Sequence, residues 1–339
     1  MANTVLILGS RGRLGAALVA AFSAAGWRVI AQTRAQAKPP EKPYPPHVQW
    51  LPADMSNPAA FSQLGAVDVV VHALNPTYTR WAIEAVALLQ SAMDLSLQYQ
   101  ATLMFPGNVY NFGAGMPALL NETTPQQPTS RKGAIRLDME RLLEQAAAVR
   151  GLRSVVIRAG DFFGCGTGSW FDLLVAKGAP RGRMGYAGPM GIGTAWAYVP
   201  DLAQTFVQVA QQRAHLSAFE VLHFAGSRLR REDWEQLMRK ALLQLGWLPP
   251  QQAMKVQTMP WPLIRALAWA VPAWREIAEM RYLWLTPHAL DGSKLARLIG
   301  AVPHTPIDEA VSQALRQLYP NQDIAQGAGD SIPVAVERS

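Results

Sequence analysis

Three glycines near the start of the chain have the spacing of a phosphate-binding turn. Gly9, Gly12 and Gly15 directly follow an apolar run, Val5 to Leu8, and apolar residues at helical spacing come after them. One glycine permits a positive φ, the next lets phosphate approach the backbone, and the last lets helix and strand pack closely. Because a helix N-terminus attracts anions, the stretch predicts a site for a dinucleotide pyrophosphate. The residues expected to contact it are Gly9, Ser10, Arg11, Gly12, Arg13, Leu14 and Gly15.

An arginine follows the second predicted strand, residues 27–33, where such a unit meets the adenosine ribose. An acidic residue here would bind the 2′-hydroxyl of NAD, whereas an arginine accommodates the 2′-phosphate of NADP. Arg34 therefore predicts NADP as the cofactor, with Arg11 as a second clamp, and leaves NAD open. The alternative is that both arginines are solvated surface residues.

Polar and small residues also follow the next two predicted strands, residues 48–51 and 67–71. Asp54, beside Met55, has a carboxylate that could accept a hydrogen bond from the adenine amine, or that could cap the helix entered at Ser56. His72 is expected to be an interior histidine beside the cofactor. The small residue Ala73, together with Asn75, would let the cofactor lie close to the strand end.

These residues need a scaffold of alternating strands and helices, and the sequence predicts one. Strands are expected at 101–105 and 152–158, with long helices at 81–97 and 130–149. This alternation predicts an α/β fold, a doubly wound parallel (Rossmann) sheet with a smaller C-terminal substrate lobe. The expected divisions are a core at 1–160, a lobe at 161–319 interleaved with the end of the core, and a disordered tail at 320–339. In the lobe we expect a strand at 221–225 and helices at 202–212, capped by Asp201, at 231–245 and at 308–318.

Taken together, the motifs resemble those of extended or atypical short-chain dehydrogenases/reductases, the superfamily that includes NAD-dependent epimerases/dehydratases. The resemblance covers Thr4 to about Leu318. It adds Arg158 to the expected cofactor-binding residues. The matching stretches are the glycine turn, Asp54-Met55, His72-Ala73, Asn108-Val-Tyr110, Arg158-Ala-Gly-Asp-Phe-Phe-Gly164 and Tyr198-Val-Pro-Asp201.

The chain departs from this superfamily at the usual catalytic Tyr-x-x-x-Lys pair. Lys132 occupies the tyrosine position and Arg136 the lysine position, and the stretch 105–108 offers no hydroxyl. Together with Glu140, these residues have a spacing similar to that of isoflavone-reductase-like and NmrA-like members. That resemblance implies Lys132 near the nicotinamide of NADPH, as an acid or base or as a group that polarises a carbonyl. Asn108 and Tyr110 are further catalytic candidates, and Tyr110 could instead be a packing residue.

Aromatic residues past the sixth strand suggest an apolar substrate pocket or, alternatively, an ordinary core; they are Phe162, Phe163, Trp170 and Trp196. The favoured hypothesis is an NADP-dependent oxidoreductase acting on an apolar small molecule. The alternatives are a cofactor-binding sensor without catalysis, and an epimerase or dehydratase acting on a sugar nucleotide.

Composition limits the remaining classes. The net charge is +7, but the arginines are dispersed, so neither nucleic acid nor a membrane surface is an expected partner. The single cysteine, Cys165, and six scattered histidines predict no metal site and, with no recognisable signal peptide, a cytoplasmic setting. The apolar stretch 260–272 is too short to span a membrane, and Arg265 interrupts it. A homodimer stays open.

Overall fold

The centre of the molecule is a seven-stranded parallel sheet. The computed structural model describes residues 2–39 and 45–322. The strand order β11-β7-β5-β4-β1-β2-β3 is that of a doubly wound sheet, as expected. The strands are β1 (Thr4–Leu8), β2 (Arg28–Thr33), β3 (Val48–Pro52), β4 (Val69–His72), β5 (Thr102–Gly107), β7 (Ser154–Arg158) and β11 (Phe219–His223).

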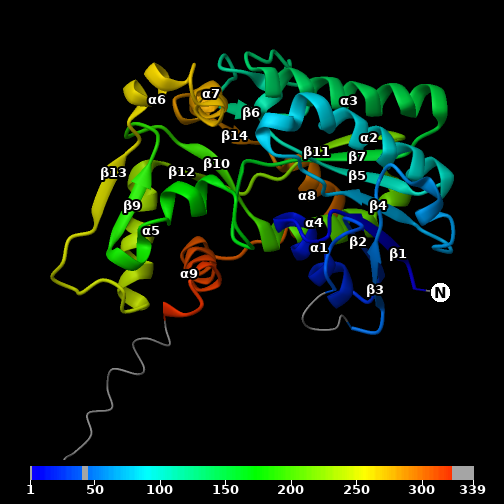
Figure 1. Cartoon of the computed structure of the whole chain (residues 1–339), viewed down its shortest axis with the longest axis horizontal. Helices are drawn as coiled ribbons and strands as arrows, with labels where there is room; N and C mark the ends of the chain where they lie inside the picture. The colour runs from blue at the N-terminus through cyan, green and yellow to red at the C-terminus, as the bar shows by residue number, and fades with distance from the viewer. Residues whose placement is uncertain (1, 40–44, 323–339) are drawn as a thin grey trace, which may run out of the picture.

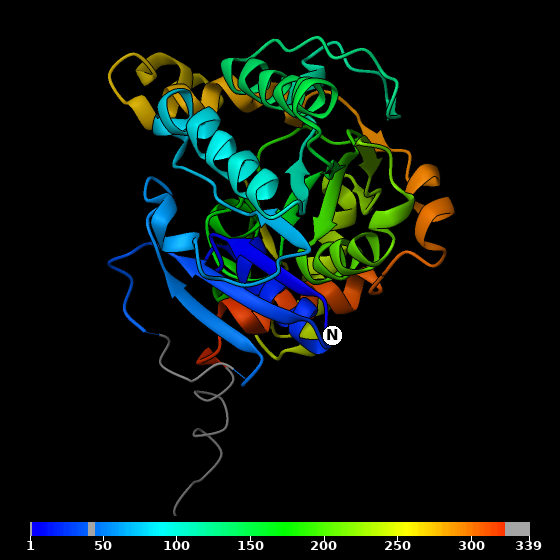
Figure 2. The same ribbon diagram turned by 90° about the vertical axis from the view of Figure 1, so that its right-hand side faces the viewer.

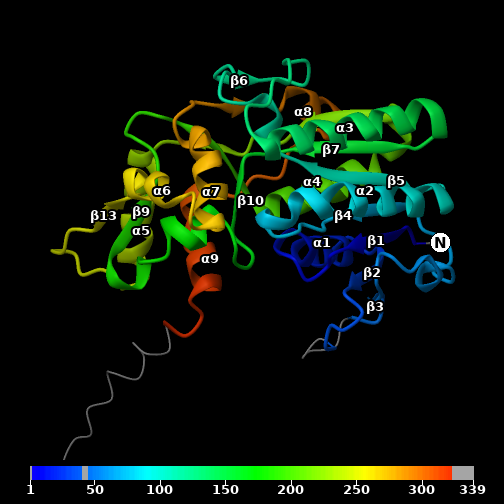
Figure 3. The same cartoon turned by 45° about the horizontal axis from the view of Figure 1, so that its top comes forward.

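Helices cover both faces of this sheet, which is why the central strands β1 and β4 are buried along their whole length. Val5 and Ile7 of β1 pack against α1 (Arg13–Ala24) and α4 (Val199–Gln211). Leu6 and Leu8 point the opposite way, into the layer formed by α2 (Trp81–Gln98) and α3 (Arg131–Arg150). Figure 2 shows α2 and α3 together on one side of the strands, and Figure 3 shows them running side by side. The result is a three-layer sandwich.

The ends of α3 follow from its sequence. Ser130 caps the helix, because its hydroxyl accepts a hydrogen bond from the Gly133 N–H at 3.0 Å. Gly151 ends it in the left-handed conformation, with φ of 69°.

The expectation for Asp201 was wrong. The helix α4 begins at Val199, before Asp201, and its N-cap is Tyr198. The Asp201 carboxylate instead accepts hydrogen bonds from the N–H and the hydroxyl of Thr305, both at 2.7 Å. It therefore ties α4 to a C-terminal loop far away in sequence.

The second lobe lies beyond the carboxyl ends of the strands (Figure 1). Its sheets are small: β8 (Asp161–Phe163) and β12 (Ser227–Leu229) flank β10 (Thr194–Tyr198), while β9 (Arg183–Tyr186) pairs with β13 (Lys255–Thr258). Its helices are α5 (Arg231–Gln244), α6 (Trp261–Leu267), α7 (Pro272–Glu279) and α9 (Ile307–Leu318). Phe163 and Trp196 lie fully buried in the core of this lobe, so these two aromatics belong to the interior and do not line the cavity.

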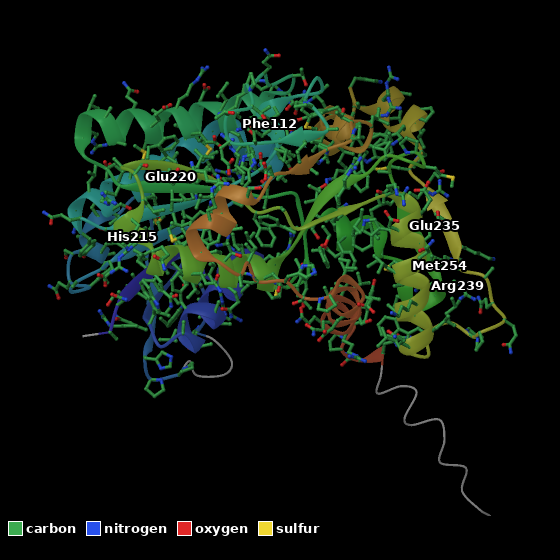
Figure 4. The ribbon with its side chains drawn as sticks, turned by 180° about the vertical axis from the view of Figure 1, so that it is seen from behind. Phe112, His215, Glu220, Glu235, Arg239 and Met254 are labelled. Atoms are coloured by element: carbon green, nitrogen blue, oxygen red, sulfur yellow. The ribbon has the colours of Figure 1, made fainter. Side chains whose placement is uncertain are left out.

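Residues from the later part of the chain complete the central sheet. The strand expected at 221–225 is β11, two residues earlier, and it pairs with β7 in the register Phe219 to Ser154. The helix α8 (Ser293–Ile299) packs beside it, with Lys294 ion-paired to Glu220. Seen from behind, Glu220 lies on the Rossmann side and Glu235 on α5 of the second lobe (Figure 4). A two-residue parallel pair, β6 (Leu119–Leu120) with β14 (Ala289–Leu290), also joins distant segments.

The apolar stretch 260–272 forms α6 and the turn into α7. Within 2–39 and 45–322, no helix is long and apolar enough to cross a membrane. Residues 40–44, and nearly all of the expected tail, lie outside the described residues.

Candidate active site

A cavity of about 810 Å³ opens where β1, β4, β5 and β7 end. One wall is the glycine turn at the start of α1, and the opposite wall comes from β8, the loop after it, and α7. Ligands of open α/β sheets bind at this edge, outside the carboxyl ends of the strands. The lining is mostly apolar on the lobe side, where it includes Phe162, Trp170, Leu173, Leu174, Met259 and Ile277.

The glycine turn has the conformation that its sequence predicts. Gly9 has φ of +81°. A Cβ placed on Gly15 would lie 2.2 Å from the Gly9 carbonyl oxygen, so the first turn of α1 touches the strand end only because Gly15 lacks a side chain. At Gly12 the corresponding distance is 3.2 Å, and this residue is the N-cap of α1.

Gln32 of β2 holds the turn in place. Its side-chain oxygen accepts a hydrogen bond from the Gly9 N–H at 2.8 Å, and its backbone oxygen accepts from both the N–H and the hydroxyl of Ser10. The Gly12 N–H bonds to the Gly9 carbonyl at 2.9 Å. The N–H groups of Gly9, Ser10 and Gly12 are already used within the turn. A bound anion would therefore accept hydrogen bonds from the N–H groups of the first turn of α1, which have no carbonyl partner within the helix.

This arrangement fits the pyrophosphate of a dinucleotide. The turn and the first residues of α1 form a cradle for the phosphates. This cradle is possible only because Gly15 lacks a Cβ, which would collide with the Gly9 carbonyl. Gly12, Arg13 and Leu14 line the cavity beside it. The helix macrodipole adds partial positive charge at that end.

The ends of β4 and β5 supply the floor of the cavity. His72, Ala73 and Asn75, which we expect from the sequence to lie beside the cofactor, line the cavity after β4. His72 is an interior histidine: its ring lies 5.5 Å from Phe105, and burial lowers its pKa to about 4, so it is neutral at pH 7. After β5, Asn108 accepts a hydrogen bond from the Tyr110 N–H at 3.0 Å, and both residues line the cavity.

The first turns of α3 place Arg136, and not Lys132, at the cavity. The Arg136 guanidinium donates to the Pro106 carbonyl at 3.1 Å and lies 4.8 Å from the Trp81 ring centroid. The Lys132 ammonium is buried and bonds to the carboxylates of Glu276 and Glu279 on α7. Lys132 is absent from the cavity lining, whereas Glu276 is part of it.

Arg158, expected beside the cofactor, points into the interior instead. It is buried and ion-paired with Glu140, its Nε lying 3.1 Å from the carboxylate. His223 lies 3.2 Å from its Nη1, and the Phe112 ring centroid 5.1 Å from its Cζ. A charge this deep persists because it is paired, and the pairing turns the side chain away from the cavity.

The adenosine-side candidates are all at the surface. Arg34 is exposed immediately after β2, and Arg11 is exposed in the glycine turn. Asp54 is also exposed, and its carboxylate accepts hydrogen bonds from the N–H and hydroxyl of Ser56 at 2.9 and 2.8 Å. These bonds lower its pKa. Met55 is half-buried beside it.

The sequence pattern did not predict a role for Asp161, although this residue belongs to the stretch Arg158–Gly164 that matches the superfamily. It is the first residue of β8 and lines the cavity. Burial raises the pKa of its carboxyl to about 7, with the Arg13 guanidinium opposing that rise. A perturbed carboxyl in a cleft is a functional-site candidate. The sequence signal that could have identified Asp161 is an acidic residue among the apolar neighbours of Ala-Gly-Asp-Phe-Phe, because such neighbours indicate that the carboxyl is buried. Within the described residues, no group of three His, Cys, Asp or Glu side chains could hold a metal ion.

A model of the NAD dependent epimerase/dehydratase family matches residues 5–222, well over half of the chain. No protein among the curated proteins matches the chain in sequence.

Solved structures with this fold are numerous and distant in sequence. A putative epimerase from Burkholderia cenocepacia J2315 is 16% identical with a TM-score of 0.73, covering 94% of this chain and 98% of that one. MoeE5 in complex with UDP-glucose and NAD is 17% identical with a TM-score of 0.70, covering 96% and 100%. The UDP-N-acetylglucosamine 4-epimerase from Bacillus cereus is 14% identical with a TM-score of 0.70, covering 94% and 99%.

Proposed function

The chain belongs to the NAD dependent epimerase/dehydratase family, and from this premise we propose that it is an NADP-dependent oxidoreductase acting on an apolar small molecule. The supporting observation is one continuous cavity that runs from the glycine turn to an aromatic and aliphatic wall. When bound, the nicotinamide would supply or accept a hydride.

The choice of NADP over NAD depends on Arg34. This residue stands directly after β2, the position from which a side chain reaches the adenosine ribose. Arg11, in the adjacent glycine turn, would give a second cation for a 2′-phosphate. No carboxylate occupies the residue after β2, where one would bind the ribose hydroxyls of NAD.

The choice of an apolar substrate depends on the lobe side of the cavity. Phe162, Trp170 and Met259 present carbon surface there, and Leu173 and Ile277 continue it. Such a wall offers a sugar few partners for its hydroxyl groups, whereas it desolvates an apolar ligand favourably.

We further propose separate roles for the residues near the expected nicotinamide. Asn108 and Tyr110, at the end of β5, would orient the substrate, because both line the cavity. Lys132 would hold α7 against α3, because its ammonium is engaged by two carboxylates. This structural role replaces the cofactor contact that the resemblance implies.

Cofactor choice is tested by calorimetry with NADP⁺ and NAD⁺. Arg34→Ala should weaken NADP⁺ binding by roughly tenfold or more, the cost of one charge-assisted hydrogen bond, and leave NAD⁺ binding unchanged. Arg183→Ala, an exposed arginine on β9 in the second lobe, is the matched control. NAD⁺ binding as tight as NADP⁺ binding in the unmodified protein would refute the reading of Arg34.

Chemistry is tested by following NADPH oxidation against a panel of enones, aldehydes and quinones. A second candidate function, a cofactor-binding sensor without catalysis, is favoured by the missing Tyr-x-x-x-Lys pair and by the ion-paired Lys132. Oxidation by any panel compound contradicts the sensor. Binding of UDP-glucose tighter than that of any panel compound would favour the sugar-nucleotide alternative.

A further inference from the structure

A carboxyl group faces the substrate side of the cavity without being part of any motif that implies catalysis. Asp161 is fixed there by its neighbours in the chain: a Cβ on Gly160 would lie 2.1 Å from the Ala195 carbonyl oxygen, so β10 approaches closely at this point. Asp161 itself is in register with Trp196 of β10. The backbone that presents the carboxyl is therefore held by a sheet and not by a loop alone.

The surroundings of this carboxyl are largely apolar and carry little compensating charge. Phe162 follows it directly and lines the same cavity, as does Trp170. The groups that interact with it electrostatically are Arg13 from α1, Tyr186 from β9 and Tyr282 from the short helix 280–284. Burial raises the pKa of both phenols above the usual value of 10, so both are neutral at pH 7.

Arg13 is therefore the cation that opposes protonation of Asp161, and its guanidinium is also bonded elsewhere. Its Nη2 donates to the Thr167 carbonyl at 2.8 Å. Burial dominates the balance and raises the pKa of Asp161 to about 7. Near neutral pH, the carboxyl is present in both protonation states, as a proton-transfer group requires.

We propose that Asp161 exchanges the proton of the substrate oxygen, in place of the phenol that α3 lacks. This inference rests on the proposed function. In a reduction, bound NADPH would supply a hydride, one hydrogen with two electrons, to the carbonyl carbon. The oxygen would then take the proton of the Asp161 carboxyl, so that an alcohol, NADP⁺ and an Asp161 carboxylate would result. Solvent at the open mouth of the cavity returns the proton, and the oxidation runs through the same steps in reverse.

The same carboxyl bears on substrate class. In its ionised form it would repel the diphosphate of a sugar nucleotide. An uncharged carbonyl compound suffers no such repulsion and can accept a hydrogen bond from the protonated form. Asp161 therefore favours neutral substrates, independently of the apolar wall.

The first test titrates the group directly, in the protein without ligands. Carbon-detected NMR on protein labelled at the aspartate carboxyls should show one signal that titrates near pH 7 and that disappears in Asp161→Asn. The control, Asp138→Asn, removes an exposed aspartate of α3 and should leave that signal in place. An Asp161 signal that titrates near pH 4 overturns the proposal whatever the substrate is.

The second test measures NADPH oxidation with the best panel compound. The unmodified protein should slow as the pH rises through about 7, because the acid form is lost. Asp161→Asn should be about 100-fold slower and lose this dependence when both proteins are saturated with NADPH. Equal rates in both proteins overturn the proton-transfer role and leave the proposed function intact. If no compound oxidises NADPH in the unmodified protein, the proposed function fails, and the role falls with it.

Discussion

The ion pairs around Lys132 allow the sharpest test of how the cavity is built. In Lys132→Ala, the carboxylates of Glu276 and Glu279 lose the ammonium that lies between them. The lysine side chain is 2% exposed, against 8% and 16% for the two glutamates, so all three groups are largely removed from water. Arg131, whose Nη2 lies 2.9 Å from Glu276, stays as a partly exposed partner.

The expected loss follows from burial. Removing one partner of a buried ion pair costs about 3–5 kcal/mol, because a charge is left uncompensated. The remaining Arg131 places this case at the lower end, about 3 kcal/mol, or roughly 4 °C in Tm for a chain of 339 residues. Arg150→Ala, which breaks the exposed Arg150–Asp94 pair on the same helix, should cost less than about 1 kcal/mol.

The pH dependence has a definite sign. Burial raises the pKa of Glu279, but hydrogen bonds from Lys132 and Arg131 outweigh it and hold that pKa below 4.5. A carboxyl whose pKa is lower in the folded protein than in the unfolded chain stabilises the folded state at pH values above its unfolded pKa. This contribution is lost as the pH falls through its folded pKa. The deficit of Lys132→Ala should therefore be complete at pH 7 and shrink below about pH 4.5.

The assay is guanidinium unfolding of the three proteins at several pH values, followed by tryptophan fluorescence. A deficit at pH 7 no larger than that of Arg150→Ala would refute the structural role of Lys132. Unchanged stability with NADPH oxidation abolished would instead restore Lys132 to a place beside the nicotinamide.

Two further substitutions test other parts of the scaffold. Gly15→Ala should abolish measurable NADPH binding, because the new Cβ would lie 2.2 Å from the Gly9 carbonyl oxygen, whereas Gly26→Ala, in open space at the end of α1, should change stability but not affinity. Equal affinity of Gly15→Ala and the unmodified protein would contradict the cradle. Arg158→Met should cost about 3–5 kcal/mol in denaturant unfolding by stranding the Glu140 carboxylate, and the double variant with Glu140→Leu should recover most of it. A double variant less stable than the single one would contradict the stranded charge and would show that Glu140 stabilises the fold through another partner, such as the Asn111 amide at 3.3 Å.

The centre of the sheet could be predicted from sequence because strands such as β1 and β4 are buried on both faces. The run Val5–Leu8 lacks the alternation of apolar and polar residues that marks a strand with one exposed face, and the glycines after it indicate the turn. The strand at 219–223 was placed two residues late, because the half-buried Phe219 and the charged Glu220 at its start break the apolar pattern. The role of Asp201 was predicted wrongly because it depends on a partner that is distant in sequence. A capping residue and a buried tether look alike until the partner, Thr305, is known.

The site was less predictable than the fold, because pairing depends on distant segments. The partners of Lys132 are 144 and 147 residues away, so nothing near Lys132 in the sequence announces its ion pairs. The partner of Arg158 is nearer, at Glu140, yet spacing alone does not say which way the guanidinium turns. Asp161 was overlooked for the opposite reason. Its raised pKa comes from burial that outweighs the nearby Arg13 guanidinium, and that balance is a property of the folded cavity.

The position of β11 in the sheet constrains the order in which this chain can fold during synthesis. β7 pairs on one side with β5, which precedes it, and on the other with β11, which is completed only at His223. Until then β7 is an open parallel edge, and the sheet face under α4 stays bare up to Gln211. Open edges and bare faces recruit other chains. The central sheet therefore cannot be completed before about two thirds of the polypeptide has been synthesised.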